Sequence, residues 1–401
     1  MSKLITIYTQ AYNVEQYIDQ CIKSVMTQTY RNFEWLLIEN GSTDKTRDII
    51  RKYAGMDERI KVNYYDKNRT GFGNDYIRKY AKGEYLVKLD SDDWIETEYL
   101  EKLIYPMEQY KADISICGAL DFEEKTGKEF AHEYGELEGV YEAKDIRDNF
   151  VEMRSYMGTY WGKMMRKNIF CEILPDHKAV YGRLRAGNSY GGDTAFMLRY
   201  FARCKTMAFI SDRLYHYRIR SNSWSMQTIS PKRLESYMAL RDIEKEFLKV
   251  CSAETEQNTI LIEMSFWTNL EQLFKRIINS DWTIQKKIKA LHTIYMDSRV
   301  KEIRKENYNS KVRTILSTYA AWYFMNMGEK QNKDLRDVLI LLEPDIFVNI
   351  TDDTYEWMSR QKELMAYIIV GEYAGAREYV KKIMDESNTT YISDLLKWLG
   401  S

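Results

Sequence analysis

Three carboxylates directly follow a short apolar run near residue 90. The run, residues 85–89, alternates with period two and leads into Asp90, Ser91, Asp92 and Asp93. This pattern predicts a buried strand, and ligands of open α/β sheets bind outside the carboxyl ends of the strands. Clustered carboxylates repel one another, and a divalent cation that carries a diphosphate would relieve the repulsion. The local pattern fits equally well an exposed acidic loop that caps the next helix.

A fourth carboxylate, Asp193, stands where an apolar helical pattern begins. It follows Gly191 and Gly192 and precedes the apolar residues of 195–201. We therefore expect it in or before the first turn of a helix, where the macrodipole favours the ionised carboxylate. A carboxylate in a cleft can act as the general base that deprotonates a sugar hydroxyl. Taken alone, Asp193 would be interpreted as a helix N-cap.

A cationic and hydroxyl-rich segment lies near residue 220. Its residues Arg218, Arg220, Ser221 and Ser223 could bind phosphate oxygens through charge-assisted hydrogen bonds, or form a solvated linker. His216, just before them, is a candidate further metal ligand, although a single histidine is more often a packed or exposed side chain.

The order of the predicted elements explains how these distant residues could share one site. Apolar runs and helical apolar patterns alternate along the first 120 residues or so, which predicts a parallel sheet with right-handed crossovers. The loops 9–13, 39–44 and 90–93 should then converge at one edge of the sheet. The predicted strands are 4–8, 33–38, 60–65, 85–89, 113–117, 161–165, 207–210 and 214–218. The predicted helices are 14–26, one ending near 53, 74–81, 97–110 and one beginning at 193, with a hairpin or excursion at 121–141 and a loop at 174–189.

The composition excludes several classes of protein. The chain has 401 residues, with 59 Lys and Arg against 60 Asp and Glu, and a net charge of -1 argues against a general nucleic-acid binder. The five cysteines are scattered without a C-x-x-C pair, which argues against disulfides and zinc–thiolate sites. Neither a signal-peptide pattern nor a transmembrane pattern is present. We therefore expect a cytoplasmic protein, or one held peripherally at the inner face of the cell membrane.

The sequence pattern changes after about residue 226. Strand patterns end and amphipathic helical patterns take over. We expect two domains, residues 1–225 with an α/β fold and residues 226–401 with an all-α fold. Binding an acceptor, forming a homodimer and docking on a membrane are all open roles for the helical half. Its clearest helical segments are 233–250, 259–278, 311–327 and 360–383.

Taken together, the motifs of about the first 225 residues resemble glycosyltransferase family 2. Ala11-Tyr12-Asn13 is similar to the family's P-x-Y-N loop, and residues 89–93 are similar to its L-D-S-D-D metal-binding motif. The other similar segments are 24–34 to S-x-x-x-Q-T-Y-x-x-F-E, 39–44 to D-D-G-S-T-D, 81–85 to A-K-G-E-Y, 192–196 to E-D-x-x-F and 215–218 to Y-x-Y-R. Each similarity is weak alone, and six in the family's order and spacing, with 81–85 and 89–93 counted as one motif, are specific.

The resemblance implies a GT-A-type fold, a mostly parallel sheet flanked by helices with a Rossmann-like nucleotide-binding half. It implies an inverting hexosyl- or N-acetylhexosaminyltransferase with Mn²⁺ or Mg²⁺ as cofactor. The implied donor is a nucleoside diphosphate sugar, UDP-linked, and the implied acceptor is a saccharide or a lipid-linked saccharide. Such enzymes commonly build bacterial cell-surface polysaccharide or glycoconjugates.

The resemblance also implies roles for particular residues. Asp193 would be the catalytic base, Asp92 would hold the metal, and Asp90 would lie near both the metal and the ribose. Asp93 would be no more than a cap for the helix after Trp94. The implied nucleotide-sugar-binding residues are Thr9, Ala11, Tyr12, Glu39, Asn40, Lys67, Gly71, Asp90, Ser91, Arg218 and Ser223.

The sequence departs from the family's pattern at several positions. Gln10 replaces the usual Pro, and Gly192 replaces the Glu before the base. Asn40 replaces the second of two paired acids, and 73–75 replaces the usual Ala-Arg-Asn, which puts the nucleobase contacts and the donor grip in doubt. None of these changes removes the metal-binding acid or the base.

Two other functions are compatible with a nucleotide cleft. A nucleotidyltransferase would need a glycine-rich, cationic loop after the first strand, which residues 9–13 lack. P-loop, dinucleotide-binding and nucleophile-elbow motifs are missing too. A non-catalytic nucleotide-sugar-binding scaffold would not need Asp92 and Asp193, which are both present.

Overall fold

The structure of the chain is a computed structural model. It describes residues 2–69, 73–185, 190–220, 229–283, 286–287, 290, 293–294, 297–306 and 378. The chain divides into two compact units, one of residues 1–228 and 235–262, the other of residues 229–234 and 263–401. The first unit contains the sheet and every candidate site residue. A domain boundary near residue 225 stays a prediction.

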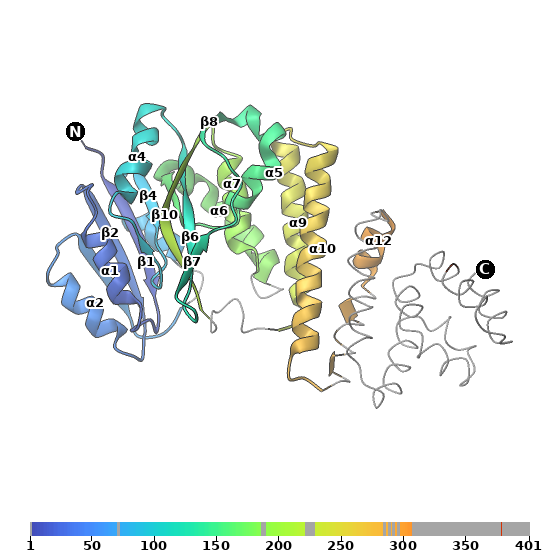
Figure 1. Cartoon of the computed structure of the whole chain (residues 1–401), viewed down its shortest axis with the longest axis horizontal. Coiled ribbons are helices and arrows are strands. Elements are labelled where there is room, and N and C mark those ends of the chain that lie inside the picture. Colours follow the sequence, from blue (N-terminus) through green and yellow to red (C-terminus); the bar gives the residue numbers. More distant parts are fainter. Residues whose placement is uncertain are drawn as a thin grey trace. The chain divides into compact units, whose positions relative to one another are not determined.

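The first unit is built on one mixed sheet (Figure 1). Its strand order is β3-β2-β1-β4-β9-β6-β10-β5, with β7 paired to β6 and β8 paired to β10. The strands β3, β2, β1 and β4 are parallel to their neighbours, as the alternating pattern predicts. The strands are β1 (Ile5–Ala11), β2 (Phe33–Asn40), β3 (Ile60–Tyr65), β4 (Tyr85–Lys88), β5 (Trp94–Ile95), β6 (Ile114–Glu123), β7 (Lys128–Ala131), β8 (Gly139–Glu142), β9 (Lys163–Arg166) and β10 (Thr206–Ile219).

The second half of the sheet is no longer purely parallel. β9 is antiparallel to both of its neighbours, β4 and β6, while β10 is parallel to β6 and antiparallel to β5. β6 and β7 form the expected hairpin. The predicted α/β fold is therefore confirmed, with a parallel first half and a mixed second half.

Helices cover the sheet because its strands are apolar on both faces. In β4, Tyr85 and Val87 belong to one hydrophobic cluster with residues of α1, α2 and α4, and Leu86 belongs to a second cluster with residues of α3, α5, α6 and α7. The period-two alternation of a strand produces this division. The helices are α1 (Ile18–Met26), α2 (Thr46–Ala54), α3 (Gly73–Tyr80), α4 (Tyr99–Gln109), α5 (Ile146–Tyr156), α6 (Lys167–Arg185), α7 (Gly192–Phe201), α9 (Arg233–Val250), α10 (Glu256–Asn279) and α12 (Ser298–Glu306).

The predicted loop at 174–189 is wrong for most of its length. α6 continues through Pro175 to Arg185. Ile169, Phe170 and Ile173 recur at helical spacing and are buried in the core. Their packing offsets the hydrogen bond that a proline inside a helix removes. Tertiary burial of the helix thus outweighs the Gly- and Arg-rich composition from which a loop was predicted.

The predictions for the remaining segments vary in outcome. The strands predicted at 207–210 and 214–218 are one strand, β10, with irregular register between Ile210 and Tyr215. The helix predicted at 233–250 is α9, and the one at 259–278 is α10. Nearly all of the segments 311–327 and 360–383 lies outside the described residues. In the part of the chain that the structure describes, no helix is long and apolar enough to cross a membrane.

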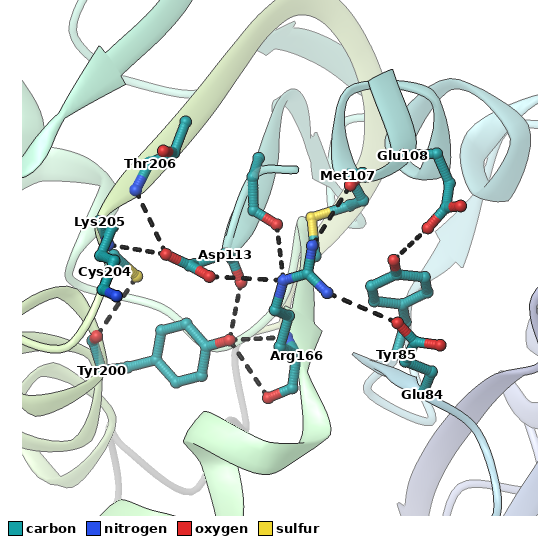
Figure 2. A network of polar contacts seen from close by, with 11 residues as sticks. Glu84, Tyr85, Met107, Glu108, Asp113, Arg166, Tyr200, Cys204, Lys205 and Thr206 are labelled. Atoms are coloured by element: carbon teal, nitrogen blue, oxygen red, sulfur yellow. Dashed lines mark hydrogen bonds and ion pairs between the residues drawn. The ribbon is translucent and has the colours of Figure 1, made fainter. Parts of the chain in front are cut away.

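A polar network ties the elements together at the start of β4, as Figure 2 shows. The guanidinium of Arg166 on β9 donates to the carbonyl of Ala112 at 3.0 Å and lies 3.4 Å from the carboxylate of Asp113. It also lies 3.5 Å from Glu84. The hydroxyl of Tyr200 on α7 donates to the Asp113 carbonyl at 2.8 Å. We call Glu84, Asp113, Arg166 and Tyr200 the Arg166 network.

Candidate active site

The loops that follow β1 and β2 meet, as the parallel order requires. The backbone N–H of Asn13 donates to the hydroxyl of Ser42 at 3.1 Å, and the N–H of Thr43 donates to the side-chain oxygen of Asn13 at 2.8 Å. Gly41 adopts a left-handed φ of 76°, and a Cβ atom there would lie 2.8 Å from the backbone of Lys67. The left-handed φ and the close approach of Lys67, in the segment after β3, therefore require a glycine at position 41.

The predicted nucleotide-binding residues of these loops differ in what they can offer a ligand. Thr9 and Ala11 are buried, and the Thr9 hydroxyl accepts a hydrogen bond from the indole of Trp35 at 3.1 Å. Tyr12 is 41% exposed, and Lys67 is exposed too. At this edge, Tyr12 offers an aromatic ring for stacking and Lys67 a cation, whereas Thr9 and Ala11 can offer only backbone atoms.

The side chains of Glu39 and Asn40 form hydrogen bonds and an ion pair with the segments that follow β2 and β3. Glu39 is buried, accepts a hydrogen bond from the N–H of Ser42 at 2.6 Å and pairs with Arg47 at 2.6 Å. The Asn40 amide donates to Asn68 at 2.7 Å and to the carbonyl of Arg69 at 2.9 Å. Their present contacts position the loop backbones around the edge of the sheet.

The role of Asp93 differs from the predicted helix cap. The residues after it form β5, which pairs with β10, and the next helix begins only at Tyr99. Asp93 is 1% exposed. One carboxylate oxygen accepts from the hydroxyl of Tyr215 at 2.7 Å and the other from the backbone N–H of Arg218 at 2.8 Å. Asp93 therefore holds the loop of residues 90–93 on β10. We call residues 90–93 the acidic loop.

Asp90 and Asp92 each pair with a cation. The ammonium of Lys88 lies 3.2 Å from the Asp90 carboxylate, and the guanidinium of Arg220 lies 2.6 Å from the Asp92 carboxylate. Burial raises the pKa of Asp92, and the neighbouring Asp90 raises it further, against the effect of Arg220. Ser91, between them, is buried.

Asp193 lies in the first turn of α7, as predicted, after Gly191 at a left-handed φ of 78°. Its side chain is open to solvent, yet protein surrounds the carboxyl group closely enough that burial raises its pKa. Lys88 opposes that rise, and Asp90 adds to it. Asp193 is thus a recessed, solvent-accessible carboxyl group within the electrostatic reach of the acidic loop.

Lys88 is the residue that sequence reasoning missed. Burial alone would lower its pKa, but the carboxylates of Asp90 and Asp193 outweigh burial and raise it. Its ammonium also lies 5.1 Å from the centre of the Tyr160 ring. The signal was a charged residue at the end of an otherwise apolar strand, directly before the acids. We call Asp90, Asp92, Asp93 and Asp193 the acid cluster, with Lys88 between its two parts.

A second lysine, Lys163 on β9, lies near the acid cluster but is fully buried. Its ammonium donates to the hydroxyl of Thr159 at 2.8 Å and to the carbonyl of Trp161 at 3.0 Å. Burial lowers its pKa to about 7, while Cys117 and Asp193 oppose that shift. A buried lysine cannot touch a substrate, so its influence on Asp193 is electrostatic.

Arg218 and His216 are held by protein partners. The guanidinium of Arg218 donates to the carbonyl of Asp92 at 2.8 Å and to the side chain of Gln20 at 2.6 Å. The ring of His216 stacks on Trp94, with one nitrogen 2.8 Å from Glu96 and the other 3.1 Å from Glu129. A phosphate or a metal would have to replace one of these partners. Gly71 and Ser223 lie outside the described residues.

The donor set at the end of β4 fits a hard divalent cation. Among the described residues, no group of three or more His, Cys, Asp and Glu has the geometry to hold a metal ion by itself. Mn²⁺ or Mg²⁺ at a diphosphate needs only one or two protein carboxylates, because phosphate oxygens and water complete the shell. Asp90 and Asp92 supply such oxygens, and the mutual repulsion that raises the pKa of Asp92 would be relieved by a cation.

The fold and the candidate site define a class of protein: an α/β protein whose candidate ligand-binding residues lie at the carboxyl ends of its parallel strands. The family model of glycosyl transferase family 2 matches residues 6–174. GlyA of Streptococcus pneumoniae is 32% identical over 230 residues, which are 55% of this chain and 31% of GlyA. EpsH of Bacillus subtilis is 30% identical over 250 residues, which are 61% of this chain and 69% of EpsH. A solved structure of residues 1–349 of TarS from S. aureus, in complex with UDP-GlcNAc, aligns at 17% identity and a TM-score of 0.49 over 92% of this chain and 91% of that TarS fragment.

The chain belongs to glycosyltransferase family 2, and its first unit has the GT-A-type α/β fold of that family. It is a glycosyltransferase. The matched region spans about a third of the length of GlyA and about two thirds of the length of EpsH.

Proposed function

We propose that this chain is a metal-dependent, inverting glycosyltransferase. It moves a sugar from a UDP-linked donor to a hydroxyl of a saccharide or lipid-linked saccharide acceptor. The observation that carries the proposal is the group of carboxylates at the carboxyl end of β4, where Lys88 pairs with Asp90 at 3.2 Å and lies within electrostatic reach of Asp193, and where Asp92 lies two residues after Asp90. One part of this group suits a metal diphosphate, and the other suits a reacting hydroxyl.

The donor nucleotide lies across the ends of β1 and β2 in this proposal. Tyr12 offers an exposed ring for the uracil, and the backbones of Thr9 and Ala11 lie beside it. Glu39 and Asn40 act through the loops that they hold. Lys67, Gly71, Ser91 and Ser223 complete the proposed donor contacts, together with Arg218.

Asp92 and Asp90 would hold Mn²⁺ or Mg²⁺, with Asp90 shared with the ribose, and His216 is the weakest candidate ligand. When bound, the ion neutralises charge on the departing diphosphate. Asp93 keeps the acidic loop on β10, because both of its oxygens already accept hydrogen bonds there. The position of the metal-binding carboxylates is therefore set by β4 and β10 together.

Asp193 acts as the general base. It takes the proton of the acceptor hydroxyl, a bond forms between that oxygen and the anomeric carbon, and the bond between the anomeric carbon and the diphosphate oxygen breaks. The attack comes from the face opposite the diphosphate, so the anomeric configuration inverts. A raised pKa brings a carboxylate closer to the operating pH, which improves a general base. The nearby Lys88 opposes that rise in the pKa of Asp193.

In this proposal the product is part of a bacterial cell-surface polysaccharide or glycoconjugate. Residues 226–401 form a helical domain that binds the acceptor, forms a homodimer or docks at the inner face of the cell membrane.

The test is a donor panel assayed with and without Mn²⁺ and with and without acceptor, measuring free nucleoside diphosphate. We expect one UDP-sugar to be turned over only with metal. Asp92→Ala should lose metal-dependent turnover and metal-dependent nucleotide binding. Asp48→Ala, which changes an exposed acid on α2 that pairs with Arg51 at 3.2 Å, should keep both. If no donor is consumed and Asp92→Ala binds nucleotide and metal as the wild type does, the proposal fails.

A further inference from the structure

Two arginines of the segment after Tyr215 approach the acidic loop in different ways. Arg218 is 8% exposed and packs its guanidinium against Trp94, Tyr17 and Phe122, with ring centres 4.7, 5.0 and 5.2 Å away. Its polar groups contact the loop backbone and Gln20. Arg218 therefore contacts the backbone of the loop that carries Asp92, and not its carboxylate.

Arg220 contacts the functional group of Asp92 itself. A terminal nitrogen of its guanidinium lies 2.6 Å from a carboxylate oxygen of Asp92, and the guanidinium lies 5.0 Å from the centre of the Tyr17 ring. Its Nε is buried and has no hydrogen-bond partner within the described residues. A buried N–H donor without a partner is unfavourable, and a ligand with acceptor oxygens would satisfy it.

We propose that Arg220 is an internal counter-ion of Asp92, which a divalent cation displaces, and that the donor diphosphate takes the freed guanidinium. This inference rests on the proposed function, because it takes Asp92 as the residue that holds the metal. Metal and nucleoside diphosphate then bind cooperatively, since each ligand takes one partner of the same ion pair.

Two physical reasons support the exchange. An arginine 2.6 Å from an Asp92 oxygen repels a divalent cation that approaches the same carboxylate, so metal alone must break the ion pair without replacing the lost contact of Arg220. A diphosphate presents several anionic oxygens, and a guanidinium binds phosphate in a bidentate manner. When the metal binds the carboxylate of Asp92, a diphosphate therefore replaces the ion-pair partner that Arg220 loses. The coupling is reciprocal, so the factor by which the nucleotide strengthens metal binding is also the factor by which the metal strengthens nucleotide binding.

The experiment measures Mn²⁺ binding to the full-length chain by electron paramagnetic resonance, first without nucleotide and then with saturating UDP. The variants are Arg220→Gln and Arg220→Met, which remove the charge, and Arg220→Lys, which keeps it. Arg220→Met retains an apolar stem beside Tyr17 in case the glutamine variant does not fold. The matched control is Arg203→Gln, which breaks an exposed ion pair with Glu172 at 2.9 Å.

Without UDP, we expect the two uncharged variants to bind Mn²⁺ about fivefold more tightly than the wild type, which is the upper range for ion pairs near a protein surface. Arg220→Lys and Arg203→Gln should resemble the wild type. With UDP, the advantage should disappear, because UDP removes Arg220 from Asp92 in the wild type as well.

Equal or weaker Mn²⁺ binding by both uncharged variants without UDP would overturn the counter-ion role. Asp92→Asn separates this failure from that of the proposed function. If the wild type with UDP binds Mn²⁺ and Asp92→Asn does not, the metal site stands and only the role of Arg220 is lost. If neither protein binds Mn²⁺ even with UDP, the metal-dependent function fails, and the inference fails with it.

Discussion

The two ends of β4 carry charged groups that the protein uses in opposite ways. At the start of the strand, Arg166 lies between Glu84 and Asp113 and also donates to backbone carbonyls (Figure 2). At the other end, the acid cluster holds four carboxylates. Lys88 pairs with Asp90 and Arg220 pairs with Asp92, whereas Asp93 is held by neutral donors. The carboxylates of the first group are paired with cations, whereas Asp93 and Asp193 of the second group form no ion pair within the described residues.

The pKa shifts express the same difference. A hydrogen bond from Lys3 lowers the pKa of Glu84, so folding favours its ionised form. Burial raises the pKa of Asp92 and Asp193, and raises that of Asp93 well above its usual value. Folding therefore disfavours the ionised forms of these three acids, and a bound cation nearby would reduce that penalty. The charges of the Arg166 network are thus satisfied within the fold, whereas those of Asp92 and Asp193, the residues proposed to serve ligands, are only partly satisfied.

The strongest way to sharpen this comparison is Asp193→Asn. Removing the base should lower kcat by about 10²- to 10⁴-fold, while the affinity for the donor stays the same because the metal-binding acids are untouched. Steady-state kinetics and donor binding by calorimetry check this. Asp113→Asn, in the Arg166 network, should keep the kcat of the folded enzyme. Loss of donor binding in Asp193→Asn would contradict the role of base.

At the start of β4, the substitution Arg166→Met should lower the free energy of unfolding and leave kcat unchanged. It leaves Asp113, whose side chain is 16% exposed, without its nearest cation, and we expect a loss of about 3 kcal/mol in the free energy of unfolding. Urea denaturation measures the loss. Arg203→Met, at an exposed ion pair, should lose less than about 0.5 kcal/mol. A large fall in kcat with unchanged stability would break the distinction between the two ends.

Ligands should stabilise the protein through the acid cluster. With Mn²⁺ and UDP together at about a hundred times the dissociation constant, the gain is about 2.7 kcal/mol, seen as a rise in Tm by scanning fluorimetry. Asp92→Asn should lose most of this rise, whereas Arg166→Met should show it from a lower starting Tm. An equal rise in Asp92→Asn would place the metal elsewhere.

The smallest effect concerns pH. The pKa of Asp193 is raised in the folded state, so ionising this group favours the unfolded chain, and the penalty grows as pH rises above the unfolded pKa. Asp193→Asn should therefore match the wild type in stability near pH 4 and exceed it at pH 7.5. We expect a gain under about 1 kcal/mol, the size of an exposed ion pair. Urea denaturation without metal at both pH values tests this, and a gain that is the same at both would show that titration is not its cause.

Local patterns in the sequence were sufficient to predict the framework of the fold. The alternation of apolar runs and helical patterns predicted β1 to β4 in order, and the amphipathic period predicted α9 with its observed bounds, Arg233–Val250. The acids at 90–93 and at 193 were also recognisable, because carboxylates after a buried strand and at a helix start are local signals. Such features depend on residues close together in the chain.

Only the tertiary structure decided what those residues contact. It inserted β9 antiparallel between β4 and β6, and continued α6 through Pro175 by burying its apolar side chains. The carboxylate of Asp93, predicted as a helix cap, instead accepts a hydrogen bond from the backbone of β10. Lys88 lies within the electrostatic reach of both Asp90 and Asp193. These outcomes depend on groups up to 125 positions apart. Residue types and spacing identify the groups that can do chemistry, but partners, burial and pKa arise only when distant segments pack together.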